Sequence, residues 1–585
     1  MERTEGRQGN AVSDIKEDLK MKKNTGFIKD ILLFLAIGIY EIFFFRTLLV
    51  ADAYPGLTED SLLVNMILEH WHDVFAGIDS WNTLPAFWPA EGSLGYSDAM
   101  LIPGLIYSVL RIVIRDPMSA FVPALVTMHL TGCIFACLFL RKLGCGRRIC
   151  IVGLLLSLWS SSFMQIAYHT QFYNIALLPV VCYFFLLFWE RRKQPFRARL
   201  PYGIAATLAY GGVWLSSFYT AYFFSLFFGG FVVLSILAFR IRQKKAGDEK
   251  TGKRTISVIA EAAFYAVLQV LWVIPFLLIY LPAYSQKKDY DAGFVLTHAP
   301  DLWDIFRTRS YAPVSHVLQN ILPISLPQEY DLYLENRRME LSCGWGWLIA
   351  FLFAGTLIFF ITKEKKGSVC GTHSVFCITG GISVILLFLA CCRYGGFLLW
   401  QYLRFVLPGA DTIRVTGRCM GVLIWPVSVT ISLGLSEFIK CTLCEKRWQN
   451  GIMAALILLL VWEGQSEIFC SNELGQIKKQ LEEVSAPPQD CRVLFMCPQS
   501  LATNQSFRMN MMGWLIADHY SVKTINGYSG SFPEGWYLIT DDVGQYYGQL
   551  MNWLNENEAA GDGIYGYLYE NDTWIPLQQI FFAAE

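Results

Sequence analysis

Long apolar segments recur along most of the chain and limit what it can fold into. Hydrophobic residues make up 54% and charged residues 16% of the 585 residues, a composition that excludes a single soluble core. Because about 20 apolar residues cross a bilayer, we expect an α-helical polytopic membrane protein. The predicted spans are 27–50, 118–140, 149–167, 173–190, 202–215, 217–239, 256–282, 344–362, 373–392, 417–439 and 451–470.

Basic residues gather in alternate connections between these spans. The tail 1–26 carries Lys20, Lys22 and Lys23, and Lys29 lies in the first turn of the first span. The positive-inside rule therefore predicts a cytoplasmic N-terminus in a multi-pass plasma-membrane protein. Further basic clusters fall on the same side: Arg141, Lys142, Arg147, Arg148, Arg191, Arg192, Lys193, Arg240, Arg242, Lys244, Lys245, Lys363, Lys365, Lys366, Lys440, Lys446 and Arg447. The net charge of -1 carries little information, because the charges sort by side of the membrane, and no nucleic-acid partner is expected.

Two segments affect the number of spans, and therefore the side of the membrane on which each later loop lies. The segment 100–114 is apolar but short, and it contains Pro103, Gly104 and Arg111. Counting it as a span would reverse every later loop, so we interpret it as a helix lying in the outer interface. The span 202–215 is the weakest, since it leaves a very short turn before the next helix.

The loop after the first span is acidic and, from 51 to 98, holds no Lys or Arg. Its acids are Asp52, Glu59, Asp60, Glu69, Asp73, Asp79, Glu91 and Asp98. A carboxylate there can act as general base, or hold a divalent cation such as Mg or Mn against a phosphate. Asp60, at the head of an apolar-periodic segment, is the first candidate, and Asp98, beside the interfacial helix, is the second. The alternative, which weighs more for each acid taken singly, is a solvated loop residue or a helix N-cap.

The later outer loop 393–418 is basic, in contrast to the acidic first loop. It carries Arg393, Arg404, Arg414 and Arg418, opposed only by Asp411. Arg suits bidentate phosphate recognition, so the loop could hold a lipid phosphate. The alternatives are headgroup anchoring or pairing with the acidic loop. His169, in a short outer turn, could join the same cavity or be a solvated loop residue.

The part after Cys470 is expected to be a small mixed α/β unit facing outward. Segments 491–496 and 564–569 read as strands and 546–554 as a helix. We divide the chain into the tail 1–26, a transmembrane domain 27–470 with outer loops 51–117 and 283–343, and a domain 471–585. In the turn 526–533, Tyr528 could stack on a sugar or pack against its own domain.

Cysteine spacing gives no zinc-like pattern, and many thiols lie in apolar segments, so no metal held by thiolates is expected. Four polar residues within or near the spans should face protein, because lipid exposure would be costly. They are His129, Glu261, Glu463 and Glu467.

Four short segments, in this order along the chain, resemble a bacterial branch of GT-C-fold membrane proteins similar to polyprenyl-phosphate-sugar-dependent glycosyltransferases. They are Phe87-Trp88-Pro89 through Ser93-Leu94-Gly95-Tyr96-Ser97-Asp98; His298-Ala299-Pro300-Asp301-Leu302-Trp303-Asp304; Leu407-Pro408-Gly409 with Ile413-Arg414-Val415 and Arg418; and Asn526-Gly527-Tyr528-Ser529-Gly530-Ser531-Phe532-Pro533. The chain departs from the branch at Thr416, at Glu534 and in the pair Glu59-Asp60.

The resemblance implies a GT-C-like bundle of about 11 transmembrane helices with a small extracytoplasmic α/β domain. It also implies transfer of a hexosyl or pentosyl group from a polyprenyl-phosphate donor to a glycan or protein acceptor of the cell envelope. Asp60, Asp98 and Glu59 are then the candidate catalytic acids. The candidate substrate-binding residues are Arg404, Arg414, Arg418, His169 and Tyr528. The competing hypothesis is a non-catalytic flippase or scaffold for lipid-linked precursors, which would tolerate loss of every loop carboxylate.

Overall fold

The computed structural model describes residues 27–50, 53–245, 263–286, 291–308, 312–321, 341, 343–365, 372–442, 445–464, 470–501, 505–559 and 561–582. Several predictions lie outside these residues. They concern the tail 1–26 with its lysines, Asp52, Glu261, Lys366, Glu467 and much of the loop 283–343.

The expected helical bundle is confirmed. Within the described part of the chain, eight helices are long and apolar enough to cross a membrane. They are Pro117–Lys142, Arg147–Ile166, Thr170–Glu190, Phe218–Arg242, Ala263–Ser285, Gly346–Glu364, His373–Cys391 and Thr416–Cys441. The three remaining predicted spans are helical too, but they are richer in charged or polar residues. They are 27–44, α9 (Phe196–Trp214) and α20 (Lys446–Glu463).

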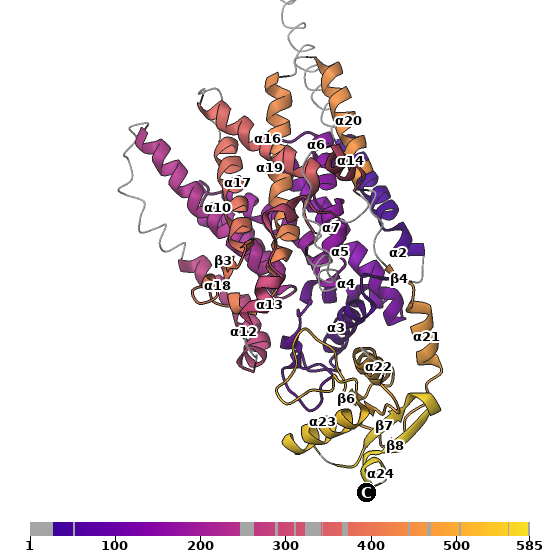
Figure 1. Ribbon diagram of the computed structural model, residues 1–585. Coiled ribbons are helices and arrows are strands. Elements are labelled where there is room, and N and C mark those ends of the chain that lie inside the picture. The colour runs from indigo at the N-terminus through magenta and orange to yellow at the C-terminus, as the bar shows by residue number, and fades with distance from the viewer. Residues whose placement is uncertain are drawn as a thin grey trace, which may run out of the picture.

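The bundle contains breaks as well as continuous helices (Figure 1). Its elements are α2 (Arg46–Val50), α5 (Pro117–Lys142), α6 (Arg147–Leu156), α7 (Ser161–Ile166), η2 (Thr170–Leu177), α8 (Leu178–Glu190), α9, α10 (Phe218–Lys245), α12 (Val270–Ser285), α16 (Gly346–Lys365), α17 (Thr372–Cys391), α19 (Cys419–Thr442) and α20. Between α9 and α10 only three residues intervene, which confirms the expected short turn.

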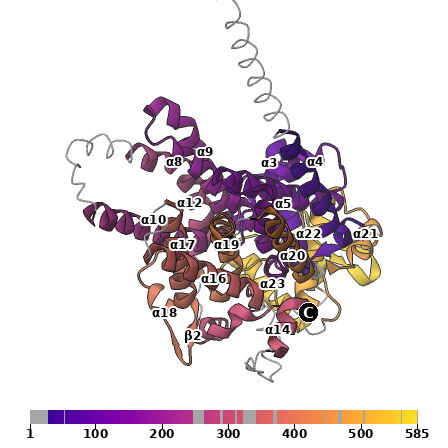
Figure 2. The ribbon, with the colours of Figure 1, turned by 90° about the horizontal axis from the view of Figure 1, so that it is seen from above.

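Burial separates inner helices from peripheral ones. The apolar window is 94% buried in the span formed by α6 and α7 and 89% buried in α19, against 28% in α10 and 6% in the span containing α12. Viewed along the bundle, α5 and α19 lie inside and α10 reaches the periphery (Figure 2). Helices α6 and α19 approach closely at Gly153, whose carbonyl accepts a 2.6 Å hydrogen bond from Ser428 Oγ. Small residues permit such contacts between membrane helices.

Short elements connect the bundle helices. They are β1 (Tyr54–Pro55), α3 (Thr58–Ala76), η1 (Ser93–Tyr96), α4 (Leu101–Arg111), α13 (Ala292–Thr297), η3 (Leu302–Phe306), α14 (Pro313–Ile321), β2 (Arg393–Tyr394), β3 (Phe397–Leu398), α18 (Trp400–Leu403), η4 (Ala410–Thr412) and η5 (Thr416–Arg418). The 11-residue helix α4 matches the expected short helix. It buries Pro103, Gly104 and Tyr107 and exposes Leu105 and Val109, as suits a helix between protein and bilayer surface.

The C-terminal unit is the expected small α/β domain. Its elements are β4 (Cys470–Ser471), α21 (Leu474–Glu482), β5 (Val493–Met496), α22 (Gln505–His519), β6 (Lys523–Thr524), α23 (Val543–Glu556), β7 (Ile564–Leu568), η6 (Tyr569–Asn571), β8 (Thr573–Pro576) and α24 (Leu577–Phe582). The sheet order is β6-β5-β7-β8, with β5 parallel to β6 and β7 and with β8 antiparallel to β7.

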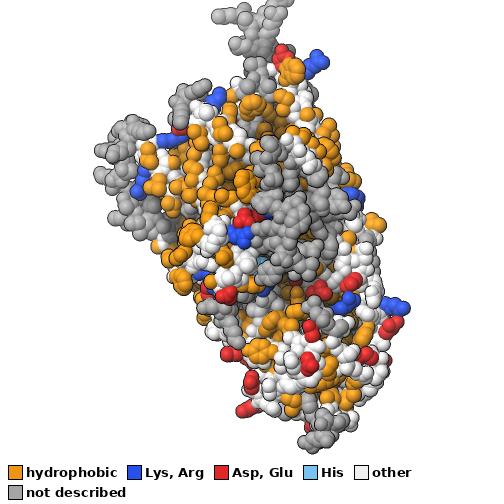
Figure 3. Space-filling view, in the orientation of Figure 1, with side chains coloured by type: hydrophobic (Ala, Val, Ile, Leu, Met, Phe, Trp, Pro, Cys, Tyr) orange, Lys and Arg blue, Asp and Glu red, His pale blue; other side chains and the backbone are white. Residues whose placement is uncertain are grey.

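This domain docks at one end of the bundle. Helix α22 packs on α3, and β4 pairs antiparallel with β1 through Tyr54 and Ser471. The basic ends of α10 and α16 lie at the opposite end (Figure 1). Apolar side chains cover most of the visible bundle surface, whereas acidic side chains are frequent over the C-terminal domain (Figure 3).

Candidate functional site

The first turn of α3 places Asp60 at the junction between the bundle and the C-terminal domain. An acid is favourable at a helix N-terminus, where the backbone N–H groups point outward. Gly56, with φ of +74°, lets the chain before α3 pass so close to Tyr168 that a Cβ would lie 2.0 Å from its carbonyl oxygen. Ser61 and Thr170 share a 2.7 Å hydrogen bond. These contacts hold the start of α3 against the segment that carries His169.

Asp60, His169 and Arg418 form a hydrogen-bonded row. His169 Nδ1 lies 2.7 Å from Asp60 Oδ2, and Arg418 Nη2 lies 3.3 Å from His169 Nε2. A guanidinium keeps its protons, so Nε2 accepts from Arg418 and Nδ1 carries the hydrogen donated to Asp60. The row therefore has a defined tautomer as well as a defined order.

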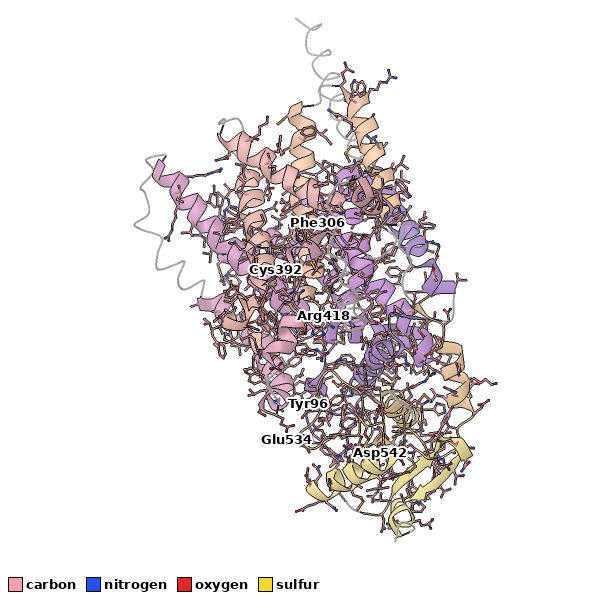
Figure 4. All side chains as sticks on the ribbon, viewed as in Figure 1. Tyr96, Phe306, Cys392, Arg418, Glu534 and Asp542 are labelled. Carbon is pink, nitrogen blue, oxygen red and sulfur yellow. The ribbon has the colours of Figure 1, made fainter. Side chains whose placement is uncertain are left out.

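Arg418 ends η5 and is only 5% exposed. Its guanidinium carbon lies 5.4 Å from the ring centre of Phe172 and 5.1 Å from that of Tyr219. The faces of aromatic rings attract a cation, which helps a buried guanidinium to remain charged. In Figure 4, Arg418 lies near the middle of the molecule, between Phe306 above it and Tyr96 below it.

The C-terminal domain contributes Tyr528, whose hydroxyl donates to Asp60 Oδ1 at 3.3 Å. Burial raises the pKa of Tyr528, and the charges of Asp60 and Glu59 raise it further, against the lowering effect of Arg414. Tyr528 therefore remains a protonated donor. Glu59 precedes Asp60 in the first turn of α3, and the Arg414 N–H donates at 3.0 Å to the hydroxyl of Tyr219, whose ring lies against Arg418.

Two segments singled out in the sequence dock against each other and place Tyr528. Phe87 N–H donates to the carbonyl of Asn526 at 3.2 Å, and Ser529 Oγ donates to the carbonyl of Tyr96 at 2.7 Å. Asn526 Oδ1 accepts from the Met496 N–H at 2.7 Å, which fixes the turn to the sheet. The turn expected at 526–533 thus joins its domain to the first loop.

Asp98 caps a helix rather than joining the row. It accepts from Phe218 N–H at 2.7 Å and from Ser217 Oγ at 3.2 Å, at the start of α10. Burial raises the pKa of Asp98 to about 6, against the opposing effects of those hydrogen bonds and of the Arg418 charge. The helix-cap alternative describes its contacts; a catalytic part for Asp98 stays a prediction.

Arg393 and Arg404 of the same charged loop have surroundings of their own. Arg393 pairs bidentately with Asp301, at 2.8 Å for both Nε and Nη2. Asp301 belongs to the outer loop 283–343 and not to the acidic loop 51–98, so this contact is not the pairing that the charges predicted. Arg404 follows α18 and is partly buried, next to Phe405 and Val406, which are 90% and 75% exposed. Its part in substrate binding stays a prediction.

A group of potential metal ligands lies inside the bundle. Glu41, His129 and Cys133 are buried, and their ligand atoms lie within 4.8 Å of one another. Trp159 Nε1 donates to Glu41 at 2.8 Å, and His129 Nε2 bonds the carbonyl of Leu158 at 3.0 Å. Such outer partners orient metal ligands. This group has residue types that could hold a metal ion, and the expectation of no metal held by thiolates stays a prediction.

The only sequence signal for this group is the four-residue spacing of His129 and Cys133, which puts both on one helix face. Glu463, like His129, faces protein as expected: it accepts from the N–H groups of Val314 at 2.8 Å and Ser315 at 3.1 Å.

No family model matches the chain, and no curated protein matches it. Among solved structures, the chain is similar to ArnT from Cupriavidus metallidurans in the apo state, at 11% identity over 93% of each chain, with a TM-score of 0.36. It is also similar to ArnT from Cupriavidus metallidurans bound to undecaprenyl phosphate, at 11% identity over 84% of this chain and 85% of that one, with a TM-score of 0.34.

Proposed function

We propose that the protein is a membrane glycosyltransferase that moves a sugar from a polyprenyl-phosphate donor to a hydroxyl group of a cell-envelope glycan or protein. The observation that carries the proposal is the row Asp60–His169–Arg418, joined by Tyr528 where the C-terminal domain meets the bundle. A carboxylate, an imidazole and a guanidinium in contact supply proton removal and phosphate binding at one place.

In the proposed reaction, the bond between the anomeric carbon and the phosphate oxygen breaks, and its electron pair stays on the phosphate. The acceptor oxygen forms the new bond to that carbon and loses its proton. Removal of this proton depends on Asp60. Arg418 and Arg414 stabilise the charge that develops on the departing polyprenyl phosphate.

The arginines have different parts in the proposal. Arg418 is buried against two rings, which help to keep its guanidinium charged where the donor phosphate would bind. Arg404 lies beside the exposed Phe405 and Val406, a composition suited to the bilayer interface, where it meets the lipid phosphate first. Glu59, which precedes Asp60, could hold a divalent cation, Mg or Mn, which would neutralise phosphate charge there.

Charge distribution supports an outward-facing site. The basic ends of α10 and α16 lie at the end of the bundle opposite the C-terminal domain (Figure 1). With positive charge retained in the cytoplasm, the N-terminus is cytoplasmic, and the row and the C-terminal domain face the outside of a bacterial plasma membrane.

The test is release of sugar from a polyprenyl-phosphate donor by purified protein, with and without divalent ions. Asp60→Asn should lower turnover by about 100-fold or more, the usual contribution of proton transfer. Asp98→Asn, which keeps a group that can accept at the start of α10, should lower it less. Glu91→Gln, an exposed acid of the same loop, is the matched control and should leave turnover unchanged.

Loss of turnover in Asp60→Asn with the fold retained would support a transferase. Wild-type protein that binds polyprenyl phosphate but releases no sugar from a broad set of donors would contradict the proposal. That outcome would favour the flippase or scaffold.

A further inference from the structure

We infer that His169, rather than Asp60, contacts the acceptor hydroxyl and takes its proton at Nε2, and that donor phosphate exposes this nitrogen by drawing Arg418 away from it. The inference rests on the proposed transfer and names the atom that performs proton removal. Asp60 is then a positioning residue.

Both oxygens of Asp60 already receive hydrogen bonds from side chains that hold it in place. Oδ2 accepts from His169 Nδ1 at 2.7 Å, and Oδ1 accepts from the Tyr528 hydroxyl at 3.3 Å. A carboxylate held in this way fixes the direction and tautomer of an imidazole, as in hydrolases that combine a nucleophile, a histidine and an acid. The Asp60 carboxylate therefore interacts with His169 rather than with a substrate.

His169 presents its other nitrogen to the group that would bind phosphate. Nε2 accepts from Arg418 Nη2 at 3.3 Å, a long bond between a neutral acceptor and a cation. A phosphate oxygen is a stronger partner for a guanidinium than a neutral nitrogen is, because the bond is between opposite charges. Donor binding thus replaces the bond from Arg418 and leaves the Nε2 lone pair for the acceptor.

The exposure of His169 and the contacts of its neighbouring residues are consistent with a role as the base. The side chains of His169 and Asp60 are 14% and 16% exposed, so the pair is sheltered but reachable. Thr170 Oγ1 donates to the carbonyl of Pro55 at 3.2 Å, next to the close contact of Gly56 with Tyr168, which holds the residues beside His169. Because the residues on both sides of His169 are held, its imidazole keeps its orientation when Arg418 moves.

The proton and the electrons balance within the site. The acceptor proton passes to Nε2, the acceptor oxygen bonds the anomeric carbon, and the electron pair of the broken bond leaves on the phosphate. The resulting imidazolium is stabilised by Asp60 at Nδ1 until its proton passes to water. Tyr528 keeps Asp60 oriented during this step.

The test uses full-length protein and a polyprenyl-phosphate sugar donor that the wild type turns over. His169→Ala should lower kcat by about 100-fold or more while binding of sugar-free polyprenyl phosphate stays within about threefold. Added imidazole should restore part of the turnover, and substituted imidazoles should restore it in order of their basicity. His169→Asn keeps a donor toward Asp60 but lacks Nε2, so it should be as slow as His169→Ala.

His519→Ala, an exposed histidine at the end of α22, is the matched control and should show wild-type rates with no response to imidazole. Turnover of His169→Ala above about a tenth of wild type, or a loss that imidazole does not repair, would overturn the part given to His169 while leaving the transferase in place. Absence of turnover by wild-type protein would overturn the transferase and this inference together.

Discussion

At the scale of single residues, Arg418 makes two kinds of contact: a hydrogen bond to an imidazole and cation–π contacts with aromatic rings. It donates to the imidazole of His169 and is held between the rings of Phe172 and Tyr219. A planar guanidinium suits both contacts, and a lysine ammonium, which is compact and strongly hydrated, suits neither.

Arg418→Lys should therefore weaken binding of polyprenyl phosphate by about tenfold, equivalent to about 1.4 kcal/mol. Titration calorimetry in detergent measures the change. Arg393→Lys is the matched control from the same loop, because its side chain pairs with Asp301, and its phosphate affinity should equal that of wild type. Equal losses in the two variants would show that only net positive charge matters.

Charge and position in the sequence suggested Asp60, His169, Arg418 and Tyr528 one at a time. Their meeting could not be predicted, because Asp60 and His169 are 109 residues apart and no local pattern connects them. The sequence also leaves Asp98 ambiguous between catalysis and capping, since a carboxylate near a helix start suits both. Only the contact with Phe218 N–H shows that it caps α10.

At the scale of elements, the start of α3 sets the geometry of the site. Apolar length predicted the membrane helices well, since burial of about 20 residues leaves a strong pattern. Apolar length could not reveal β6, which is two residues long. Nor could it reveal the pairing of β1 with β4, which the bundle helices separate in the sequence. Strands this short have no periodicity of their own, and their partners come from tertiary contacts.

Two glycines flank α3, and comparing their alanine variants distinguishes the effect of backbone strain from the effect of a displaced site. Gly56 and Gly77 have φ of +74° and +77°, but a Cβ at Gly77 would meet nothing within 4 Å. Gly77→Ala should therefore cost only about 1 kcal/mol of stability, as expected for left-handed backbone, and keep full turnover. Gly56→Ala must also move α3 away from Tyr168, and should lower kcat by about tenfold or more, because small displacements at a site are expensive.

Thermal unfolding in detergent and donor turnover measure the two effects. Similar turnover in both variants would mean that the close approach at Gly56 does not position Asp60.

At the scale of the whole molecule, a cluster of acids lies where the C-terminal domain docks on the first loop. Helix α22 packs on α3, and Arg111 of α4 pairs with Glu69 at 2.7 Å. Burial raises the pKa of Asp73 to about 6; the charges of Glu69 and Asp79 raise it further, against His70 and Arg111. Burial also raises the pKa of Asp518, with the charges of Glu69, Asp73 and Asp79 adding to it and that of Arg111 opposing.

The sign of the resulting pH dependence follows from these directions. Asp73 holds its proton more tightly in the folded protein than in the unfolded chain, whose aspartates keep the ordinary value of 3.8. Its contribution to stability is therefore lost as pH rises from about 4 through about 6, and is flat above that range. The melting temperature should fall across this window.

Asp73→Asn should flatten that fall. Glu482→Gln, an exposed acid on α21, should not. Unfolding followed by intrinsic fluorescence at several pH values measures both, and an unchanged slope in Asp73→Asn would contradict the assignment to this cluster.

The hydrogen bond between Tyr528 and Asp60 joins residues 468 positions apart. Its consequence concerns the order of synthesis. A ribosome finishes every bundle helix before it makes the turn that carries Tyr528, so the nascent chain holds Asp60, His169 and Arg418 in an unfinished arrangement. Chains that end before Tyr528 lack this donor to Asp60.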